Sequence, residues 1–377
     1  MANNNKHTGP NVPALRFPEF SEEWKTFQLS DLAAYSKERV KMEILSSNNY
    51  VSTENMQQDF AGIKDAISLP SSGTAVEFQV GDILISNIRP YLKKIWLSDR
   101  NGGCSTDVLA LRTKNEKVDS SFLYCCLAND DFVSYVMSGA KGVKMPRGDK
   151  QHILSYNLGV PSVQEQRRIA ELVSLLEKRI SAQSKIIEDK ETLYKAISNI
   201  LFSHYANSSP TYKLGDLANL YQPETIPSTK LSRGGRYLVY GANGIIGRYD
   251  KYNHEESQIC LTCRGNTCGN INFSQPYSWI TGNAMVINID NNINNIDKRF
   301  LYHYMKNYNF TPFISGSGQP QIVRSTVEKL PVLNVNIQTQ KKIASILDSI
   351  VMSIDIARKK VDLDQNVKKY LLKNLFI

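Results

Sequence analysis

The chain has 377 residues, of which 41% are hydrophobic and 21% charged, and its formal net charge is +9. This composition predicts two folded domains with connecting segments, and the positive charge favours a polyanionic partner. No stretch approaches the ~20 consecutive apolar residues of a membrane helix, so we expect no membrane association. The polar residues 1–11 lack the apolar region of a secretion signal. We therefore expect a cytoplasmic protein with a disordered N-terminus.

The second half of the sequence repeats the first half in the same order. A repeat this long is not a solenoid, whose period is ~20–50 residues. The matching blocks are Leu29–Leu32 with Leu214–Leu217, Phe122–Tyr124 with Phe300–Tyr302, Gln166–Ala170 with Gln340–Ala344, and Leu201-Phe202 with Leu375-Phe376. The last two pairs share a spacing of 174 residues, whereas the first two are 185 and 178 apart. The pattern predicts two copies of one module, each a globular part followed by a tail of constant length.

The first globular part is expected over residues 12–160 and has the pattern of a mixed α/β domain. Apolar runs broken by glycine predict strands at residues 75–80, 82–86, 94–97 and 108–112. Residues 120–136 have helical spacing. We interpret this region as a first domain of mixed α/β structure.

The second globular part, residues 206–335, repeats this pattern. Strands are predicted at residues 257–262, 270–273 and 284–289, and a helix at 297–307. The fold class is therefore α/β, with two similar mixed α/β domains and a pseudo-two-fold duplication.

The two tails, residues 161–205 and 336–377, have the pattern of long helices. Residues 162–203 contain neither proline nor glycine, and steps of four and three residues meet mostly apolar side chains in both tails. At 1.5 Å per residue each helix would be ~60 Å long. The predicted seam is Ile169, Val173, Leu176, Ile180 and Ile187 in the first tail, and Ile343, Leu347, Ile350, Ile354 and Val361 in the second.

Two arrangements of the tails are possible. Each helix could pack on its own globular part, or the two could pair as one antiparallel coiled coil within the chain. We favour the antiparallel pair, because helices this long exceed what a domain needs internally and because the tails match in length. Polar residues at Gln183, Lys190, Asp364 and Lys368 would then fix the register.

Basic, polar loops recur at matching positions in the two globular parts. Residues 86–94 and 141–148 form such loops in the first part, and residues 263–267 and 315–321 are their counterparts. Arginine, lysine, asparagine and glutamine are the side chains that pair with base edges and phosphates. The candidate DNA-binding residues are Arg89, Tyr91, Lys93, Lys94, Lys141, Lys144, Arg147, Arg264, Asn266, Gln319 and Gln321.

Motifs for catalysis and for cofactors are missing from the sequence. It lacks the glycine-rich loops that bind ATP or dinucleotides, an Asn-Pro-Pro-Tyr-type methyltransferase motif, and the acidic pair with lysine of a metal-dependent nuclease. His254, Cys260, Cys263 and Cys268 could supply four zinc ligands, but their spacing fits no paired-knuckle site and we favour free thiols. We therefore expect no catalytic residues, no metal and no cofactor of its own.

Several stretches together resemble the specificity subunits of type I restriction–modification systems. The stretches are Val12–Phe20 with Trp24, Ile85–Lys94, Gly139–Gly148, Gly241–Gly247, Trp279–Ala284 and Pro161–Ala170. The resemblance covers essentially the whole chain. The second tail departs from it, because Thr339 stands in place of Glu165 and Asn336 in place of Ser162, so we expect that helix to be capped differently.

The resemblance implies a target-recognition domain in each globular part, each reading one half of a split site in double-stranded DNA. The helices would set the spacing and dock two methyltransferase subunits, and restriction subunits would complete the endonuclease. S-adenosylmethionine, ATP and Mg would serve those partner subunits. The chain itself would be non-catalytic and would act in DNA methylation and phage defence.

Three other functions stay open. One is a specificity subunit of a methyltransferase-only system. A second is a coiled-coil scaffold whose globular parts bind proteins rather than DNA. The third, an enzyme in its own right, is disfavoured by the missing catalytic motifs.

Overall fold

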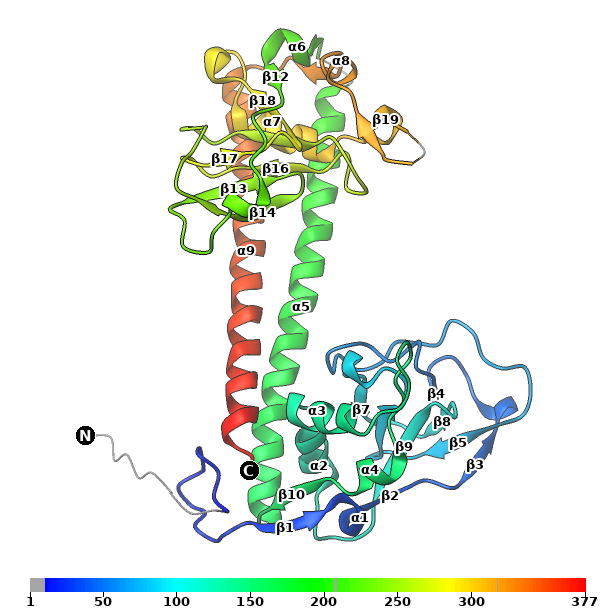
Figure 1. Ribbon diagram of the computed structural model, residues 1–377. Helices are drawn as coiled ribbons and strands as arrows, with labels where there is room; N and C mark the ends of the chain where they lie inside the picture. The colour runs from blue at the N-terminus through cyan, green and yellow to red at the C-terminus, as the bar shows by residue number, and fades with distance from the viewer. Residues whose placement is uncertain (1–10, 207–208, 317) are drawn as a thin grey trace. The chain divides into compact units, whose positions relative to one another are not determined.

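The computed structural model describes residues 11–206, 209–316 and 318–377, and its contacts divide the chain into two compact units (Figure 1). Unit 1 comprises the chain up to Ala182 together with Val361–Ile377, and unit 2 comprises Gln183–Lys360. Each of the two long helices therefore contributes one segment to each unit. The N-terminal stretch predicted to be disordered lies, except for residue 11, outside the described residues.

A four-stranded antiparallel sheet of the same strand order forms the centre of each unit. In unit 1 the order is β2 (Ala33–Tyr35), β9 (Val108–Thr113), β6 (Ile83–Ser86) and β7 (Ile95–Leu97). In unit 2 it is β12 (Asn219–Tyr221), β18 (Ala284–Asn288), β15 (Ile259–Thr262) and β16 (Ile271–Phe273). All four residues of β6 and of β15 are buried, as their apolar runs predict for central strands. The shared strand order confirms the internal duplication.

Shorter elements that flank this sheet are also duplicated. In unit 1 they are β1 (Lys25–Gln28), which pairs with β10 (Asn157–Val160), and the helices α1 (Leu29–Leu32), α2 (Ser120–Leu127) and α4 (Lys150–Leu154). In unit 2 they are β11 (Thr211–Lys213), which pairs with β21 (Pro331–Leu333), and the helices α6 (Leu214–Leu217), α7 (Lys298–Asn307) and α8 (Arg324–Val327).

Each unit also has a sheet of its own. Unit 1 adds the order β3 (Arg39–Lys41), β5 (Thr74–Phe78), β8 (Gly102–Cys104) and β4 (Tyr50–Val51). Unit 2 adds β14 (Gly244–Tyr249), β13 (Tyr237–Gly241) and β17 (Trp279–Ile280).

The helix predicted over residues 120–136 is two helices, α2 and α3 (Asp130–Ser138). Asn129 separates them with an extended backbone. Its side chain accepts a hydrogen bond from the backbone of Phe132 at 2.9 Å and donates one to the carbonyl of Cys126 at 2.7 Å. The asparagine thus caps the start of α3 and the end of α2, a competition that helical periodicity alone does not reveal.

A buried glutamine fixes the start of the first long helix, α5 (Val163–Ala206). The Gln166 amide is fully buried and donates to the carbonyls of Lys117 at 2.8 Å and Pro161 at 2.9 Å. Its oxygen accepts from the backbone of Asp119 at 2.8 Å, and the Asp119 carboxylate caps the start of α2. One side chain therefore joins the helix start, the preceding strand end and the neighbouring helix.

The same arrangement fixes the start of the second long helix, α9 (Ile337–Asn374). Gln340 is 2% exposed and donates to the carbonyls of Asn295 at 3.1 Å and Val335 at 2.7 Å. It accepts from the backbone of Asp297, the residue that caps α7, at 2.8 Å. The hydrogen bonds of Gln166 and Gln340 are equivalent one by one, and we call the two residues the glutamine clamps.

The end of each long helix packs into the unit whose globular part comes from the other copy. In unit 2 the ring of Phe202, near the end of α5, lies 5.8 Å from that of Phe300 in α7. In unit 1 the ring of Phe376, just after α9, lies 5.6 Å from that of Phe122 and 6.5 Å from that of Trp24. The end of the first tail therefore completes the core of unit 2, and the end of the second tail completes the core of unit 1.

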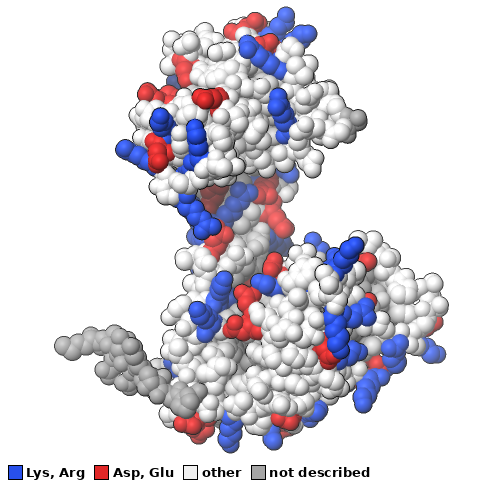
Figure 2. All heavy atoms as spheres, in the orientation of Figure 1, with Lys and Arg blue, Asp and Glu red and all other residues white. Residues whose placement is uncertain are grey.

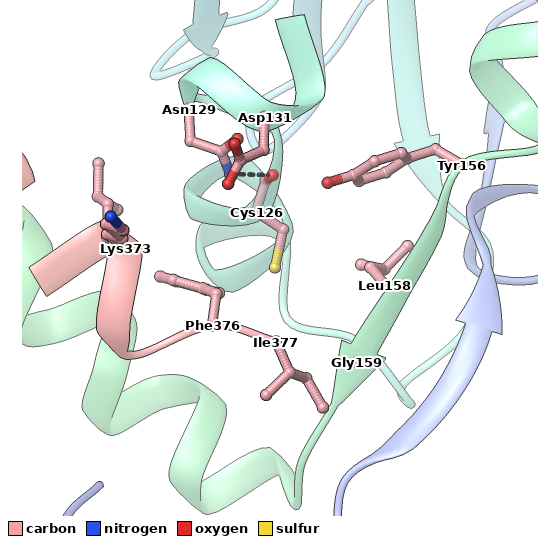
Figure 3. A pocket seen from close by; sticks show the side chains of 10 residues that line it. Cys126, Asn129, Asp131, Tyr156, Leu158, Gly159, Lys373, Phe376 and Ile377 are labelled. Atoms are coloured by element: carbon pink, nitrogen blue, oxygen red, sulfur yellow. Dashed lines mark hydrogen bonds between the residues drawn. The ribbon is translucent and has the colours of Figure 1, made fainter. Parts of the chain in front are cut away.

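Figure 3 shows this packing in unit 1, where Phe376 and Ile377 lie against Cys126, Leu158 and Gly159 around a small pocket. A side chain at position 159 would place its Cβ 2.4 Å from Cγ1 of Ile377 and 3.0 Å from the ring of Trp24. Glycine at this position thus allows the end of the chain to approach β10.

The two helices pair in opposite directions, as predicted. In unit 1 Lys368 bonds Glu177 at 2.6 Å and Arg179 bonds Asp364 at 2.8 Å; in unit 2 Lys190 bonds Ser353 at 3.1 Å. Residue numbers rise along one helix as they fall along the other. Every predicted seam residue is buried or half-buried, namely Ile169, Val173, Leu176, Ile180, Ile187, Ile343, Leu347, Ile350, Ile354 and Val361. Three of the four predicted polar positions, Lys190, Asp364 and Lys368, join the helices through these bonds.

Both helix starts are capped in the same way, by a side-chain oxygen that accepts from the backbone three residues further on, so the expected difference is limited to residue type and distance. The Asn336 side chain accepts from the backbone of Thr339 at 2.9 Å at the start of α9, and Ser162 makes a longer contact of 3.4 Å to the backbone of Glu165. The Glu165 carboxylate instead binds the Arg16 guanidinium through two hydrogen bonds of 2.8 and 2.7 Å. Both side chains are buried, with exposed fractions of 1% and 2%.

Replacing Glu165 by alanine should lower the free energy of unfolding by about 3 kcal/mol, because a buried arginine loses its partner. Glu171→Ala is the matched control on the same helix, since the Arg168–Glu171 pair is exposed on both sides and should contribute less than ~1 kcal/mol. Urea titration followed by circular dichroism measures both variants. Equal midpoints for the two would contradict a structural role for the buried pair.

Candidate nucleic-acid interface

In unit 1 the two predicted basic loops lie side by side. Lys141 and Arg147 exchange backbone hydrogen bonds of 2.9 Å in both directions and close a hairpin, residues 141–147, which we call hairpin 1. The loop that follows β6 binds this hairpin through its backbone, because the amide of Arg89 donates to the carbonyl of Pro146 at 2.8 Å. The amide of Gly148 donates to the carbonyl of Asn87 at 3.0 Å.

Unit 2 contains the same assembly. Strands β19 (Ile314–Ser315) and β20 (Gln321–Ile322) close hairpin 2, residues 315–321, which projects from unit 2 in Figure 1 and includes Ser317, outside the described residues. The amide of Gly265 donates to the carbonyl of Pro320 at 2.9 Å. The amide of Ile322 donates to the carbonyl of Cys263 at 3.0 Å.

These hydrogen bonds match the two hairpins residue by residue. The correspondence pairs Arg147 with Gln321, Pro146 with Pro320, Gly142 with Gly316, and Arg89 with Gly265. The matched glycines share the left-handed backbone, with φ of 97° at Gly142 and 91° at Gly316. Glycine adopts a positive φ without the steric cost that other residues have. The matching glycines therefore indicate that the two hairpins have the same backbone conformation.

The hairpin side of the candidate interface in unit 1 is exposed and partly braced by acidic residues. Lys144 is exposed. Lys141 binds Asp149 at 2.9 Å, and its hydrogen bond, with those from backbone amides, lowers the pKa of the Asp149 carboxyl to about 2. Arg147 is 57% exposed and binds Asp107 at 2.8 Å.

The strand-end loop contains a tight turn of unusual backbone. Arg89 and Lys93 have φ of 50° and 56° on either side of the 3₁₀ turn Pro90–Leu92. Left-handed backbone at a non-glycine residue costs ~1–2 kcal/mol and occurs where the surroundings require it. The turn leaves Arg89 exposed and Tyr91 47% exposed.

Two of the candidate DNA-binding residues in this loop, both lysines, already have partners. Lys93 binds Asp130 at 2.7 Å, and the Lys94 ammonium donates to the carbonyl of Thr53 at 2.6 Å. Burial, and then the charge of Arg89, lower the pKa of Lys94. These contacts give both lysines an internal role, whereas Arg89 and Lys144 present their cations to solvent.

In unit 2 the candidates are exposed and mostly neutral. Arg264, Asn266, Gln319 and Gln321 are all exposed, and Arg264 lies across the backbone ladder from Gln321. Gln321 takes the place of Arg147, and Ser315 and Gly318 take the places of Lys141 and Lys144. The two copies therefore offer similar backbones with different hydrogen-bonding groups.

Charge alone does not mark one surface. Figure 2 shows Lys and Arg side chains on the visible face of both units, with Asp and Glu side chains interspersed among them. The matched loops therefore indicate the candidate interface more strongly than surface charge does.

The residues considered as zinc ligands form other contacts or are free thiols. The His254 ring bonds the Tyr221 hydroxyl at 2.8 Å, and the Cys263 thiol accepts from Gln222 at 3.0 Å. Cys260, Cys263 and Cys268 are free thiols. Among the described residues, no group of three or more His, Cys, Asp and Glu side chains could hold a metal ion, and no helix is long and apolar enough to cross a membrane.

Comparison with known proteins identifies the family. The family model described as "Type I restriction modification DNA specificity domain" matches residues 21–189 and again residues 208–363. The chain belongs to this family of type I restriction–modification specificity subunits. The two matches cover the two copies that the sequence and the strand order show.

Relatives of this family match the chain at low identity. The MjaVIII specificity subunit of Methanocaldococcus jannaschii is 23% identical over 95% of this chain and 92% of its own length. A putative specificity subunit of Haemophilus influenzae is 28% identical over 142 residues, a match that spans 36% of each chain. The crystal structure of an S subunit from M. genitalium shares the fold with a TM-score of 0.69 at 19% identity, covering 97% of this chain and 99% of the other.

The loops are predictable from the sequence, but the residues that position them are not. Asp107, which braces Arg147, directly precedes β9 and carries no motif. The clamps Gln166 and Gln340 stand within the repeated blocks, so the repeat was a usable signal, but their burial was not foreseen. The αL backbone at Arg89 and Lys93 has no signature in residue type.

Replacing Gly316 by alanine should loosen hairpin 2, because the added Cβ would lie 2.7 Å from the carbonyl oxygen of Gln319 at a φ of 91°. Gly318→Ala is the matched control, because nothing lies within 4 Å of a Cβ there. Hydrogen exchange at the paired residues Ser315 and Gln321 should quicken about 5- to 150-fold in the first variant, as expected for a local cost of ~1–3 kcal/mol. Unchanged exchange would show that the hairpin tolerates the substitution.

Proposed function

We propose that each unit reads one half of a split site in double-stranded DNA, through the hairpin and strand-end loop that the two units share. The observation that supports this most strongly is the matched set of backbone bonds between these loops in both units. Two copies of one exposed loop assembly suit two half-sites of different sequence. Family membership supports DNA as the ligand, and the exposed side chains of these loops can bind phosphates and base edges.

The exposed residues divide into two chemical classes. Arg89 and Lys144 are exposed cations suited to phosphates, whose contacts give affinity that falls as salt rises. Arg147, Gln319, Gln321 and Asn266 carry groups that can form hydrogen bonds with base edges. Tyr91 adds a half-exposed ring beside them.

The proposed domain boundaries are those of the sequence, with recognition domains at residues 12–160 and 206–335 and helical spacers at 161–205 and 336–377. The antiparallel helices would set the distance between the half-sites. Their bonded polar pairs fix one register, which a spacer requires.

The long helices also expose apolar side chains away from the seam. On α5 in unit 2 these are Ile186, Leu193 and Ile200, at intervals of one heptad, with exposed fractions of 40%, 49% and 68%. On α9 in unit 1 they are Leu363, Val367 and Tyr370, with exposed fractions of 61%, 40% and 60%. Exposed apolar rows on a helix are typical of partner-binding faces.

We propose that two methyltransferase subunits dock on these rows. Methyl transfer from S-adenosylmethionine to adenine would belong to them, and ATP and Mg would serve restriction subunits that join the complex in the cytoplasm. A methyltransferase-only system would use the same chain without the restriction subunits.

Exchanging residues 12–160 for the same region of a relative should change one half of the methylated motif and leave the other half and the spacing intact. Sequencing of methylated bases in cells that carry the chain with its methyltransferase measures this. A change in both halves would contradict one domain for each half-site. Absence of any sequence-specific methylation would favour the protein-binding scaffold.

Replacing Leu193 by aspartate should prevent assembly with the methyltransferase subunit and leave the fold intact, because Leu193 is 49% exposed. Ile354→Asp is the contrasting variant, because Ile354 is only 6% exposed. The buried, unpaired charge should lower the free energy of unfolding by roughly 3 kcal/mol. Co-purification and thermal unfolding separate the two effects. Normal assembly of the Leu193 variant would exclude this face as the docking surface.

A further inference from the structure

We propose that one position of each hairpin reads a base directly: Arg147 reads guanine in one half-site, and Gln321 reads adenine in the other. This inference rests on the proposed function and assigns specificity to two named side chains. It follows from backbone geometry, exposure and side-chain chemistry taken in turn.

The backbone at this position is held on both sides. Arg147 pairs with Lys141 across hairpin 1 and with Ile88 in the strand-end loop, so it forms the middle of a short three-stranded ladder. Gln321 pairs in the same way with Ser315 and with Arg264. Base readout requires a side chain placed to within ~0.5 Å, and a backbone bonded from two sides provides such a platform.

The side chain at this position nevertheless faces solvent. Arg147 is 57% exposed, and Gln321 is exposed. One nitrogen of the Arg147 guanidinium binds Asp107 at 2.8 Å, which orients the group and leaves other N–H donors available. No described residue forms a hydrogen bond with the Gln321 side-chain amide.

No other matched position in the hairpins has, in both copies, a side chain that forms paired hydrogen bonds with one base. Gly142 and Gly316 have no side chain, and Pro146 and Pro320 have no polar one. The remaining pairs are Lys141 with Ser315, Val143 with Ser317, Lys144 with Gly318, and Met145 with Gln319. In none of these do both members form paired hydrogen bonds with a single base.

The chemistry of the two side chains specifies the bases. Arginine donates two parallel hydrogen bonds to the O6 and N7 of guanine in the major groove, and glutamine pairs its amide with the N6 and N7 of adenine. One fixed backbone position with two side chains thus gives two different readings. The shared scaffold would let the chain recognise an asymmetric site.

Reciprocal exchange tests the inference. Duplexes selected from a random library by the chain in complex with its methyltransferase subunit give the preferred motif. Arg147→Gln should change one guanine of one half-site to adenine, with a loss of roughly 10- to 100-fold in affinity for the original duplex. Gln321→Arg should change one adenine of the other half-site to guanine.

Lys144→Gln is the matched control, because it removes the same charge from the same hairpin. It should weaken binding to all duplexes and reduce the salt dependence without altering the motif. Arg147→Lys keeps the charge and loses the paired geometry, so it should relax the guanine preference even if the glutamine variant is unstable.

The outcomes distinguish a failure of the proposed function from a failure of the base-reading assignment. A parent complex that selects no motif would overturn the proposed function. A parent motif retained base for base by Arg147→Gln, Arg147→Lys and Gln321→Arg would overturn the base-reading assignment alone. An altered half-site in each reciprocal variant would support it.

Discussion

The structure depends on burying an amide at the start of each long helix and satisfying all of its hydrogen bonds. A buried amide without partners costs ~1–3 kcal/mol or more, so Gln166 and Gln340 are stable only where three backbone groups converge. For Gln166 those groups are the carbonyl of Pro161 after the preceding strand, the carbonyl of Lys117 in the loop before a neighbouring helix, and the amide of Asp119, which caps that helix. The clamp therefore sets the direction in which each long helix leaves its globular part, and the seam residues continue from there.

The proposed recognition surface separates positioning from reading. Hydrogen bonds between backbone groups hold the hairpins, so they persist whatever side chains occupy the exposed positions. Arginine in one copy and glutamine in the other can then stand at the same place without disturbing the fold. This separation is suited to a protein whose binding preference must vary while its architecture stays constant.

Much of the fold was predictable, because periodicity and repetition are directly visible in the residues. The seam from Ile169 to Ile187 and its partner from Ile343 to Val361 were found by spacing alone, and the loop pairs by repetition. The break at Asn129 was missed because a cap competes with a helical pattern that continues through it. The pairing of Lys93 with Asp130, and of Arg147 with Asp107, depends on residues distant in sequence, which no local pattern reports.

The exchange of helix ends between the two copies has a consequence for synthesis of the chain. Unit 2 is formed by one continuous stretch, Gln183–Lys360, and can fold as soon as that stretch has left the ribosome. Unit 1 cannot complete its core until Leu375 and Phe376 have been made, although most of it is translated first. During that interval the apolar surface around Trp24 and Phe122 lacks the cover that Leu375 and Phe376 provide, so the earliest-made part of the chain is the last to become native. Slow translation of the C-terminal helix would therefore prolong the period in which nascent chains are prone to aggregate.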